Sequence, residues 1–321
     1  MKKSIAIILC MTLLLTALLA GCGSKPLKFG AGVFVSAPTT TDAGEKDGAG
    51  KYDITVAGIT VDANGKIVAC ALDTLQVSAG FTADGKAVAK ESFPTKYELG
   101  MGYNMVAYGG ATKEWFEQAD AFEGVVVGKT LAEVKALMVE GNKGNDDVIK
   151  AGCTITIEAF VAAIEKAFAN AAESKATAKD TLKVGMFTEQ SLADATEEKD
   201  GSNQVATTVV VTAVGADGKV TAASSDCVQV KFTFNAQGVS TFDTSKSVLT
   251  KKEQGMDYGM VAYGGATKEW FEQAAIFDAT CIGKTASEIA GLMDAEGTPN
   301  TDLQTAGCTI VVTGFVKAAT K

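Results

Sequence analysis

Apolar and polar residues alternate along two neighbouring stretches early in the chain, residues 52–61 and 66–77. Both stretches are rich in β-branched side chains, and an Asn-Gly turn sequence at 64–65 separates them. Alternation on both sides of such a turn predicts a β-hairpin. The same pattern returns over residues 207–214 and 219–230. The front part of each half of the chain is therefore expected to form an antiparallel sheet.

The pattern becomes helical further along each half. Trp115, Ala119 and Phe122 recur at the spacing of one helix face, and Thr112 stands where it can cap the helix. A second helix is predicted to begin at Thr130, because Thr-Leu-Ala-Glu has the spacing of a capping box. The second half repeats these features with Trp270, Ala274, Phe277 and Thr285. The mixed order of hairpins followed by helices predicts an α+β fold.

One block shows that the chain is a tandem duplication. Residues 105–119 return letter for letter as residues 260–274, at an offset of 260 − 105 = 155. The same offset relates Leu27-Lys28 to Leu182-Lys183 in the expected opening strands. Two copies of one domain follow. We predict repeat domains over 27–172 and 182–321, joined by a linker at 173–181. Each domain is expected to have an antiparallel sheet and about three helices. A single core spanning both repeats would contradict this arrangement.

The first residues have the features of an export signal. Two lysines precede an apolar run from Ile5 to Ala20, which is short for a membrane span. The run ends in Leu-Ala-Gly-Cys22, which resembles the lipobox of bacterial lipoproteins. The resemblance implies a signal peptide over 1–21, lipid on Cys22 and a short tether over 22–26. The mature chain is then expected on the extracytoplasmic face of the cell membrane.

Composition excludes several kinds of chemistry. The chain has no histidine, and all 29 of its basic residues are lysine. Ser-His-Asp or Cys-His catalysis and zinc sites with His ligands are therefore excluded within this chain. Any bound anion has to be held by backbone amides, hydroxyl groups or lysine. A net charge of −9 without a basic cluster argues against nucleic acid as a partner.

Two other interpretations carry little weight. Residues 42–47 are acidic but lack the ligand spacing of a calcium-binding loop, so we interpret them as part of a turn. Five cysteines follow Cys22, and only Cys153 and Cys308 occupy matching places in the two repeats. An odd number with this distribution argues against a disulfide repeated in each domain.

The repeated block is a candidate site. Gly109-Gly110 precedes a predicted helix, where amides and the positive helix end can meet an anion, and Tyr108 and Trp115 offer rings for stacking. Their counterparts in the second repeat are Gly264-Gly265, Tyr263 and Trp270. The alternative is a glycine turn beside a core tryptophan. The sequence leaves both interpretations open.

The closing segment of each repeat points to a family. Residues 147–164 read Asp-Val-Ile-Lys-Ala-Gly-Cys-Thr-Ile-Thr-Ile-Glu-Ala-Phe-Val-Ala-Ala-Ile, a strand-like stretch that runs into a helix. Together with the Asn-Gly hairpin, this segment resembles the FMN-binding domain, the family that includes the covalent-flavin subunits of sodium-pumping NADH:quinone oxidoreductase. The resemblance leaves the middle of each repeat unexplained. Ala151 also stands where the family has Ser, and Cys153 where it has Ala.

The resemblance implies a cofactor and its attachment sites. Gly152 and Gly307 match the motif glycine, and Thr154 and Thr309 match the threonine that takes FMN through a phosphoester. The rings of Tyr108, Trp115, Tyr263 and Trp270 are then expected to stack on the flavin.

Two functions follow as hypotheses. The first is a flavin-carrying electron-transfer lipoprotein with a redox partner. The second is a non-catalytic surface module that keeps the fold without flavin and binds a surface ligand or partner. We find no acid–base constellation for an enzyme in its own right. A flavoprotein would be yellow, whereas the binding module would be colourless.

Overall fold

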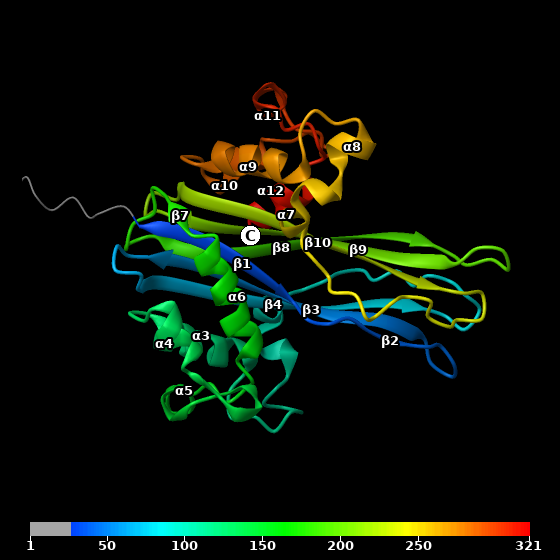
Figure 1. The fold of residues 1–321 in the computed structure, drawn as a ribbon, viewed down its shortest axis with the longest axis horizontal. Coiled ribbons are helices and arrows are strands. Elements are labelled where there is room, and N and C mark those ends of the chain that lie inside the picture. The colour runs from blue at the N-terminus through cyan, green and yellow to red at the C-terminus, as the bar shows by residue number, and fades with distance from the viewer. Residues whose placement is uncertain (1–26) are drawn as a thin grey trace, which may run out of the picture.

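The computed structural model describes residues 27–321, so the predicted signal peptide and Cys22 lie outside the described residues. The predicted α+β fold is confirmed, because antiparallel sheets pack against several helices. The two large sheets face each other, and the helices of each repeat cover the outer face of its own sheet (Figure 1). The result is a sandwich of four layers, with helices outside and sheets inside.

The first sheet belongs to the first repeat. Its strands run in the order β2-β3-β1-β7, and β4 pairs with the free side of β3. The long hairpin of β3 and β4 matches the predicted one. Part of the expected linker is β7, which pairs with the start of β1. The bounds are β1 (Lys28–Val35), β2 (Thr39–Thr41), β3 (Gly48–Val61), β4 (Ile67–Phe81) and β7 (Ala172–Glu173).

The second sheet belongs to the second repeat and has the order β10-β9-β8. Its strands are β8 (Thr181–Ala193), β9 (Gly201–Val214) and β10 (Val220–Phe234). β8 is continuous, whereas its counterpart in the first repeat is divided into β1 and β2 around Pro38. Proline has no N–H for the ladder, so it marks an interruption of an edge strand.

The outer layers are formed by the helices of each repeat. The first repeat has α2 (Lys96–Leu99), α3 (Trp115–Val126), α4 (Leu131–Lys135), α5 (Asp146–Ala151) and α6 (Glu158–Ala169), with a small pair β5 (Met138–Val139) and β6 (Lys143–Gly144). The second has α7 (Lys251–Gln254), α8 (Met260–Gly264), α9 (Trp270–Cys281), α10 (Ala286–Ala290), α11 (Thr301–Ala306) and α12 (Thr313–Ala319). The predicted capping boxes at Thr130 and Thr285 are confirmed.

Three local predictions are wrong. The N-cap of α3 is Glu114 instead of Thr112, and its carboxylate fills the role expected of the hydroxyl. Residues 151–157 form the end of α5 and a loop instead of a strand, because Gly152 adopts the left-handed conformation that ends the helix. The opening strands align at an offset of 153 instead of 155: Gly32 and Gly185 lie against equivalent helix positions, Ala163 and Ala318.

The hydrophobic core has three parts. One outer cluster lies between the first sheet and its helices, and a second lies between the second sheet and its helices. The inner cluster is built from both sheets and includes Ile54, Val56, Val209 and Phe232. Each repeat therefore keeps an outer core of its own, and the two repeats share the inner core.

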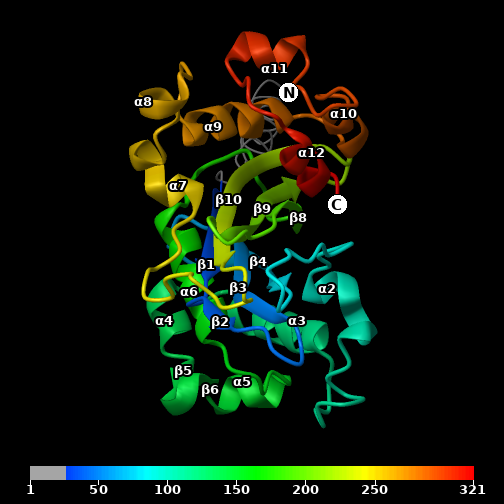
Figure 2. The same ribbon diagram turned by 90° about the vertical axis from the view of Figure 1, so that its right-hand side faces the viewer.

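The contacts between the repeats follow an approximate twofold axis. Phe81 stacks on its own counterpart Phe234, with ring centroids 4.6 Å apart. The Ala43 amide donates to the Gly238 carbonyl at 2.8 Å, and the equivalent bond joins Ala195 to Gly85 at 2.7 Å. Two ion pairs are also equivalent, Lys166–Glu253 at 2.6 Å and Lys321–Glu98 at 2.5 Å. The repeats thus pack like the subunits of a symmetric dimer (Figure 2).

Candidate functional site

Glu114 organises the repeated block. It is buried, and its two carboxylate oxygens accept the amides of Met105 at 2.9 Å and Val106 at 3.1 Å. Glu269 makes the same bonds to the second copy of the loop. The carboxylate closes the loop onto the start of α3 and occupies the positive end of that helix. A protein carboxylate therefore already lies at the helix end beside Gly109-Gly110, which favours the interpretation of this block as a structural turn.

Gln118 joins the repeated block to the Gly-Cys-Thr segment. Its Oε1 accepts the amide of Thr154 at 2.8 Å, the hydroxyl of Thr154 at 3.0 Å and the amide of Ile155 at 3.2 Å. Its Nε2 donates to the Lys113 carbonyl at 3.1 Å. Gln273 forms the equivalent set around Thr309. The structure thus brings together two sequence features in which Gln118 and Thr154 lie 36 residues apart.

A lysine lies against the motif glycine. Gly152 has a φ of +109°, and a Cβ on it would lie 2.2 Å from the Lys113 Nζ. Gly307 has the same relation to Lys268. The left-handed backbone favours glycine here. The Lys113 side chain lies against this glycine, two residues before Thr154.

Cys153 and Cys308 fill the position between the glycine and the threonine. Both side chains are buried, and burial raises the pKa of each thiol to about 11. The thiols are therefore protonated at neutral pH and are poor nucleophiles. All five cysteines of residues 27–321 are free.

A cavity of about 610 Å³ opens next to the Gly-Cys-Thr segment of the first repeat. Ile155 and Thr156, which follow Thr154 directly, form part of its wall. The Lys96 ammonium lies 4.9 Å from the centroid of the Tyr103 ring and 5.5 Å from that of Trp115. The volume falls in the range of small-molecule sites. The remaining lining residues are Phe34, Ser36, Ala37, Asp53, Thr55, Thr74, Met105, Glu158, Ala159 and Phe160.

The predicted ring residues divide into two groups. Trp115 and Trp270 are buried and pack against Phe160 and Phe315, and Trp115 also lines the cavity. Tyr108 and Tyr263 are 87% and 92% exposed, and Tyr108 does not line the cavity. Of the predicted site residues in the first repeat, Trp115 alone lines this cavity, and Thr154 directly precedes the lining residues Ile155 and Thr156.

The sequence interpretation missed Lys113, Glu114 and Gln118 as organising residues, as well as Lys96. The first three belong to the block that is identical in both repeats. Their exact repetition was the sequence feature that could have identified them. Lys96 has a counterpart in Lys251, whose ammonium lies 5.6 Å from the Trp270 ring. The sequence offered no sign that these lysines stand over aromatic rings.

The second repeat keeps Thr309, Gly307 and Trp270 but differs around them. By the strand register and the helix alignment, Asp53, Thr74 and Glu158 correspond to Ala206, Cys227 and Thr313. Glu189 stands at the position of Ser36, and its Oε2 would lie 3.7 Å from a Cβ on Gly314. At these positions the second repeat therefore lacks the carboxylates of Asp53 and Glu158 and has one at a different place, on Glu189.

Comparisons with protein-family models, curated proteins and solved structures found no match for this chain. Within residues 27–321, no three side chains of the metal-ligating types His, Cys, Asp and Glu come together. The helices of that part of the chain are all too short or too polar to span a membrane.

Proposed function

We propose that this chain is an extracytoplasmic lipoprotein that carries FMN on Thr154 and exchanges electrons with a redox partner. The observation that carries the proposal is the position of the exposed residue Thr154, directly before Ile155 and Thr156, which line an aromatic-walled cavity of about 610 Å³. Thr309 is the corresponding attachment point in the second repeat. The lipid anchor is proposed at Cys22, outside the described residues.

The residues present are compatible with FMN. Thr154 is an exposed residue, and Gln118 would keep the two backbone amides if the threonine hydroxyl became an ester. The Lys113 ammonium is placed to offset phosphate charge in a chain without arginine. The rings of Tyr103, Trp115 and Phe160 would cover the apolar part of the cofactor.

Bound FMN would supply the redox chemistry. The protein's own groups would position and shield it. Trp115 is fixed by its edge contact with Phe160, and Lys96 lies over both cavity rings. The buried Thr55 and Thr74 hydroxyls bind each other at 3.0 Å and line the floor.

Intact-mass analysis tests the proposal. After coexpression with a flavin transferase, wild-type protein is expected to be yellow and to gain one or two FMN groups. Thr154→Ala and Thr309→Ala are each expected to remove one group, and the double variant both. The control is Thr39→Ala, which changes an exposed threonine that does not line the cavity and should leave the mass gain unchanged. An unmodified wild type whose Trp115 and Trp270 fluorescence is not quenched by added FMN would contradict the proposal.

The anchor has a separate test. Cys22→Ala is expected to move the protein from the membrane fraction to the soluble extracytoplasmic fraction, because a lipidated cysteine would be its attachment to the bilayer. Fractionation with labelled fatty acid measures both location and lipid. A variant that stays membrane-bound and labelled like the parent would show that Cys22 is not the anchor.

A second function is favoured by a different observation. Packing and hydrogen bonding account for Glu114, Trp115 and Gln118 of the repeated block, but Tyr108 and Tyr263 are identical residues that remain almost fully exposed. Exposed apolar residues that recur in both repeats are typical of contacts with a partner. A colourless, unmodified protein would therefore leave a surface-binding module as the better explanation.

A further inference from the structure

The segment that joins the two repeats covers one edge of the first sheet. Its strand β7 pairs antiparallel with the start of β1, with Ala172 opposite Phe29. The Ser174 amide donates to the Leu27 carbonyl at 3.2 Å. Ala176 is 2% exposed and belongs to the inner core cluster together with Phe29. The segment therefore extends the sheet with its backbone and adds a small side chain to the inner core.

The same segment also reaches the second sheet. Asp180, at its end, accepts the hydroxyl of Thr221 on β10 at 2.6 Å through Oδ2. Since β1 and β10 belong to different sheets, residues 172–180 cross the opening between the two sheets on this side. Phe29 and Ala31 of β1 are buried there. By the twofold axis, the equivalent opening lies between β8 and β4.

β8 is the counterpart of β1, and its matching edge is open. At the offset of 153, Leu182 and Val184 correspond to Phe29 and Ala31. Within residues 27–321, β8 pairs only with β9. Leu182 and Val184 are half-buried, whereas their counterparts are buried. The second repeat therefore leaves uncovered the surface that the joining segment covers in the first repeat.

The free backbone groups of this edge follow from the alternation of hydrogen bonds along an antiparallel strand. The Leu27 carbonyl faces β7, so the odd-numbered residues at the start of β1 direct their N–H and C=O groups away from β3. The Ala31 carbonyl follows this rule and accepts the Asn170 side-chain amide at 2.9 Å. In β8 the corresponding groups belong to Leu182 and Val184. Within residues 27–321 no hydrogen bond is made to these outward groups.

The chain covers the other outer strands at the corresponding places. Glu123 of α3 accepts the Leu72 amide of β4 at 2.6 Å, and Asp278 of α9 accepts the Ser225 amide of β10 at 3.0 Å. β7 covers β1 in the same way. An uncovered edge offers unpaired N–H and C=O groups to an additional strand. Residues 181–184 of β8 present such an edge within the described chain.

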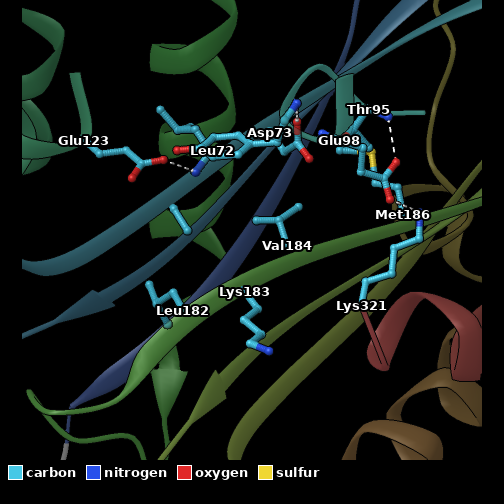
Figure 3. A pocket seen from close by; sticks show the side chains of 12 residues that line it. Leu72, Asp73, Thr95, Glu98, Glu123, Leu182, Lys183, Val184, Met186 and Lys321 are labelled. Carbon is cyan, nitrogen blue, oxygen red and sulfur yellow. Dashed lines mark hydrogen bonds and ion pairs between the residues drawn. The ribbon is translucent and has the colours of Figure 1, made fainter. Parts of the chain in front are cut away.

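A cavity of about 620 Å³ lies beside this edge, in the opening between β8 and β4. Leu182 and Val184 stand on the side of β8 that faces Leu72 of β4 (Figure 3). Lys183, between them in sequence, is exposed. Ala71 and Met186 add further apolar wall. A strand added to β8 would direct every second side chain into this space.

The carboxylates at the cavity already have partners within the protein. The Oδ1 of Asp73 accepts the amides of Thr74 at 2.7 Å and Tyr97 at 3.2 Å. Glu98 pairs with the Lys321 ammonium at 2.5 Å. The groups left without a partner are the apolar side chains and the outward backbone groups of β8. An occupant with a free backbone and small apolar side chains is therefore complementary to this place.

We propose that the open edge of β8 binds an extended peptide segment of a partner protein that has alanine or valine at every second position. The segment adds to β8 antiparallel, bonds to the backbone of Leu182 and Val184, and places its small side chains in the cavity. The joining segment is the template for this ligand class, because residues 172–177 occupy the equivalent edge of β1 with alanine at both ends of the alternation. The site is separate from the Thr154 cavity and does not depend on flavin.

Fluorescence polarisation with a labelled peptide tests the proposal on the full mature chain. The probe is Asn-Ala-Val-Glu-Val-Lys-Val-Thr-Ala, which is residues 170–178 with valine at the three inward positions 172, 174 and 176. Valine is chosen because it favours strands and fills more of the cavity than alanine. Saturable binding is expected. The control peptide Asn-Ala-Val-Val-Val-Glu-Lys-Thr-Ala has the same composition without the alternation and is expected to bind roughly tenfold more weakly.

Variants of one residue locate the binding edge. Leu182→Pro removes an outward N–H and leaves the ladder to β9 intact, so it is expected to weaken peptide binding roughly tenfold. Leu182→Val keeps the amide and an apolar side chain, and it should bind like the wild type. Circular dichroism confirms that each variant is folded.

A second variant fills the edge from within the chain. Lys321 corresponds to Lys166 at the helix offset of 321 − 166 = 155, so a copy of residues 167–177 added after Lys321 places the joining segment beside β8. This extended protein is expected to lose peptide binding. Absence of saturable binding to the wild type, or equal binding by the wild type and the extended protein, would overturn the proposal. A wild-type dimer that Leu182→Pro converts to a monomer in light scattering would also overturn it, because a second copy would then occupy the edge.

Discussion

Replacing Gly32 by alanine is expected to lower the free energy of unfolding by about 3 kcal/mol, the upper part of the usual range for overpacked sites. A Cβ on Gly32 would lie 2.1 Å from the Ala163 carbonyl oxygen and 2.3 Å from the Ala167 amide nitrogen. Both atoms belong to the backbone of α6, so no side-chain rotation relieves the clash. The helix would have to move away from β1, which opens the outer core. Urea denaturation followed by circular dichroism measures the change.

The second repeat offers an equivalent glycine that should respond in the same way, and a glycine in α3 offers a control substitution. Gly185→Ala is expected to act like Gly32→Ala, because its Cβ would lie 1.9 Å from the Ala318 carbonyl oxygen. Gly124 lies in α3, and a Cβ at this position would have no neighbouring atom within 4 Å, so Gly124→Ala should stabilise the protein by about 0.5–1 kcal/mol. Equal stability of Gly32→Ala and wild type would show that β1 and α6 are not packed this closely.

The contribution of Asp73 to the free energy of unfolding is expected to fall by about 4 kcal/mol as the pH rises from about 4 to about 8. The pKa of Asp73 is raised by burial from 3.8 to about 7. That is about three units at about 1.4 kcal/mol each. A carboxyl group with a raised pKa stabilises the folded state below its unfolded value, and this contribution is lost as the pH rises through the folded value. Denaturation curves at several pH values measure the slope.

Asp73→Asn identifies the group responsible. The amide oxygen of Asn can still accept the Thr74 and Tyr97 amides, but it does not ionise. The variant is therefore expected to show a smaller fall in stability with pH and to be more stable than wild type at pH 8. Glu197→Gln, at an exposed position, should leave the slope unchanged. An unchanged slope in Asp73→Asn would mean that another group controls the pH dependence.

Local patterns in the sequence predicted the elements well where one face of a helix or one tight turn decided the structure. The hairpin of β3 and β4, the buried Trp115 face of α3 and the Thr130 cap all depend on neighbouring residues. Predictions failed where a distant group or one backbone angle decided the result. Glu114 caps α3 because its carboxylate also binds the Met105 and Val106 amides, and no local rule includes that loop.

The sequence predicted only part of the candidate site. Thr154 directly precedes two residues that line the same cavity as Trp115, and Gln118 joins Thr154 to the repeated block. A glutamine on a helix gives no pattern that indicates which segment its side chain binds. Tyr108 was placed in the site because it is adjacent in sequence to Gly109, yet the loop directs it into solvent.

The sequence by itself determined the duplication, the hairpins and helix faces of each repeat, and the absence of histidine and arginine chemistry. Only the tertiary structure decided what covers each face. The alternation along β3 indicated one buried and one polar face. Thr55 and Thr60, which point to opposite faces, are nevertheless both buried. The reason is that helices cover one side of the sheet and the second sheet covers the other. Period-two patterning records which residues share a face, whereas the layer that packs on it depends on contacts between distant segments. The same reason applies to Asp73, whose burial arises where the two repeats meet.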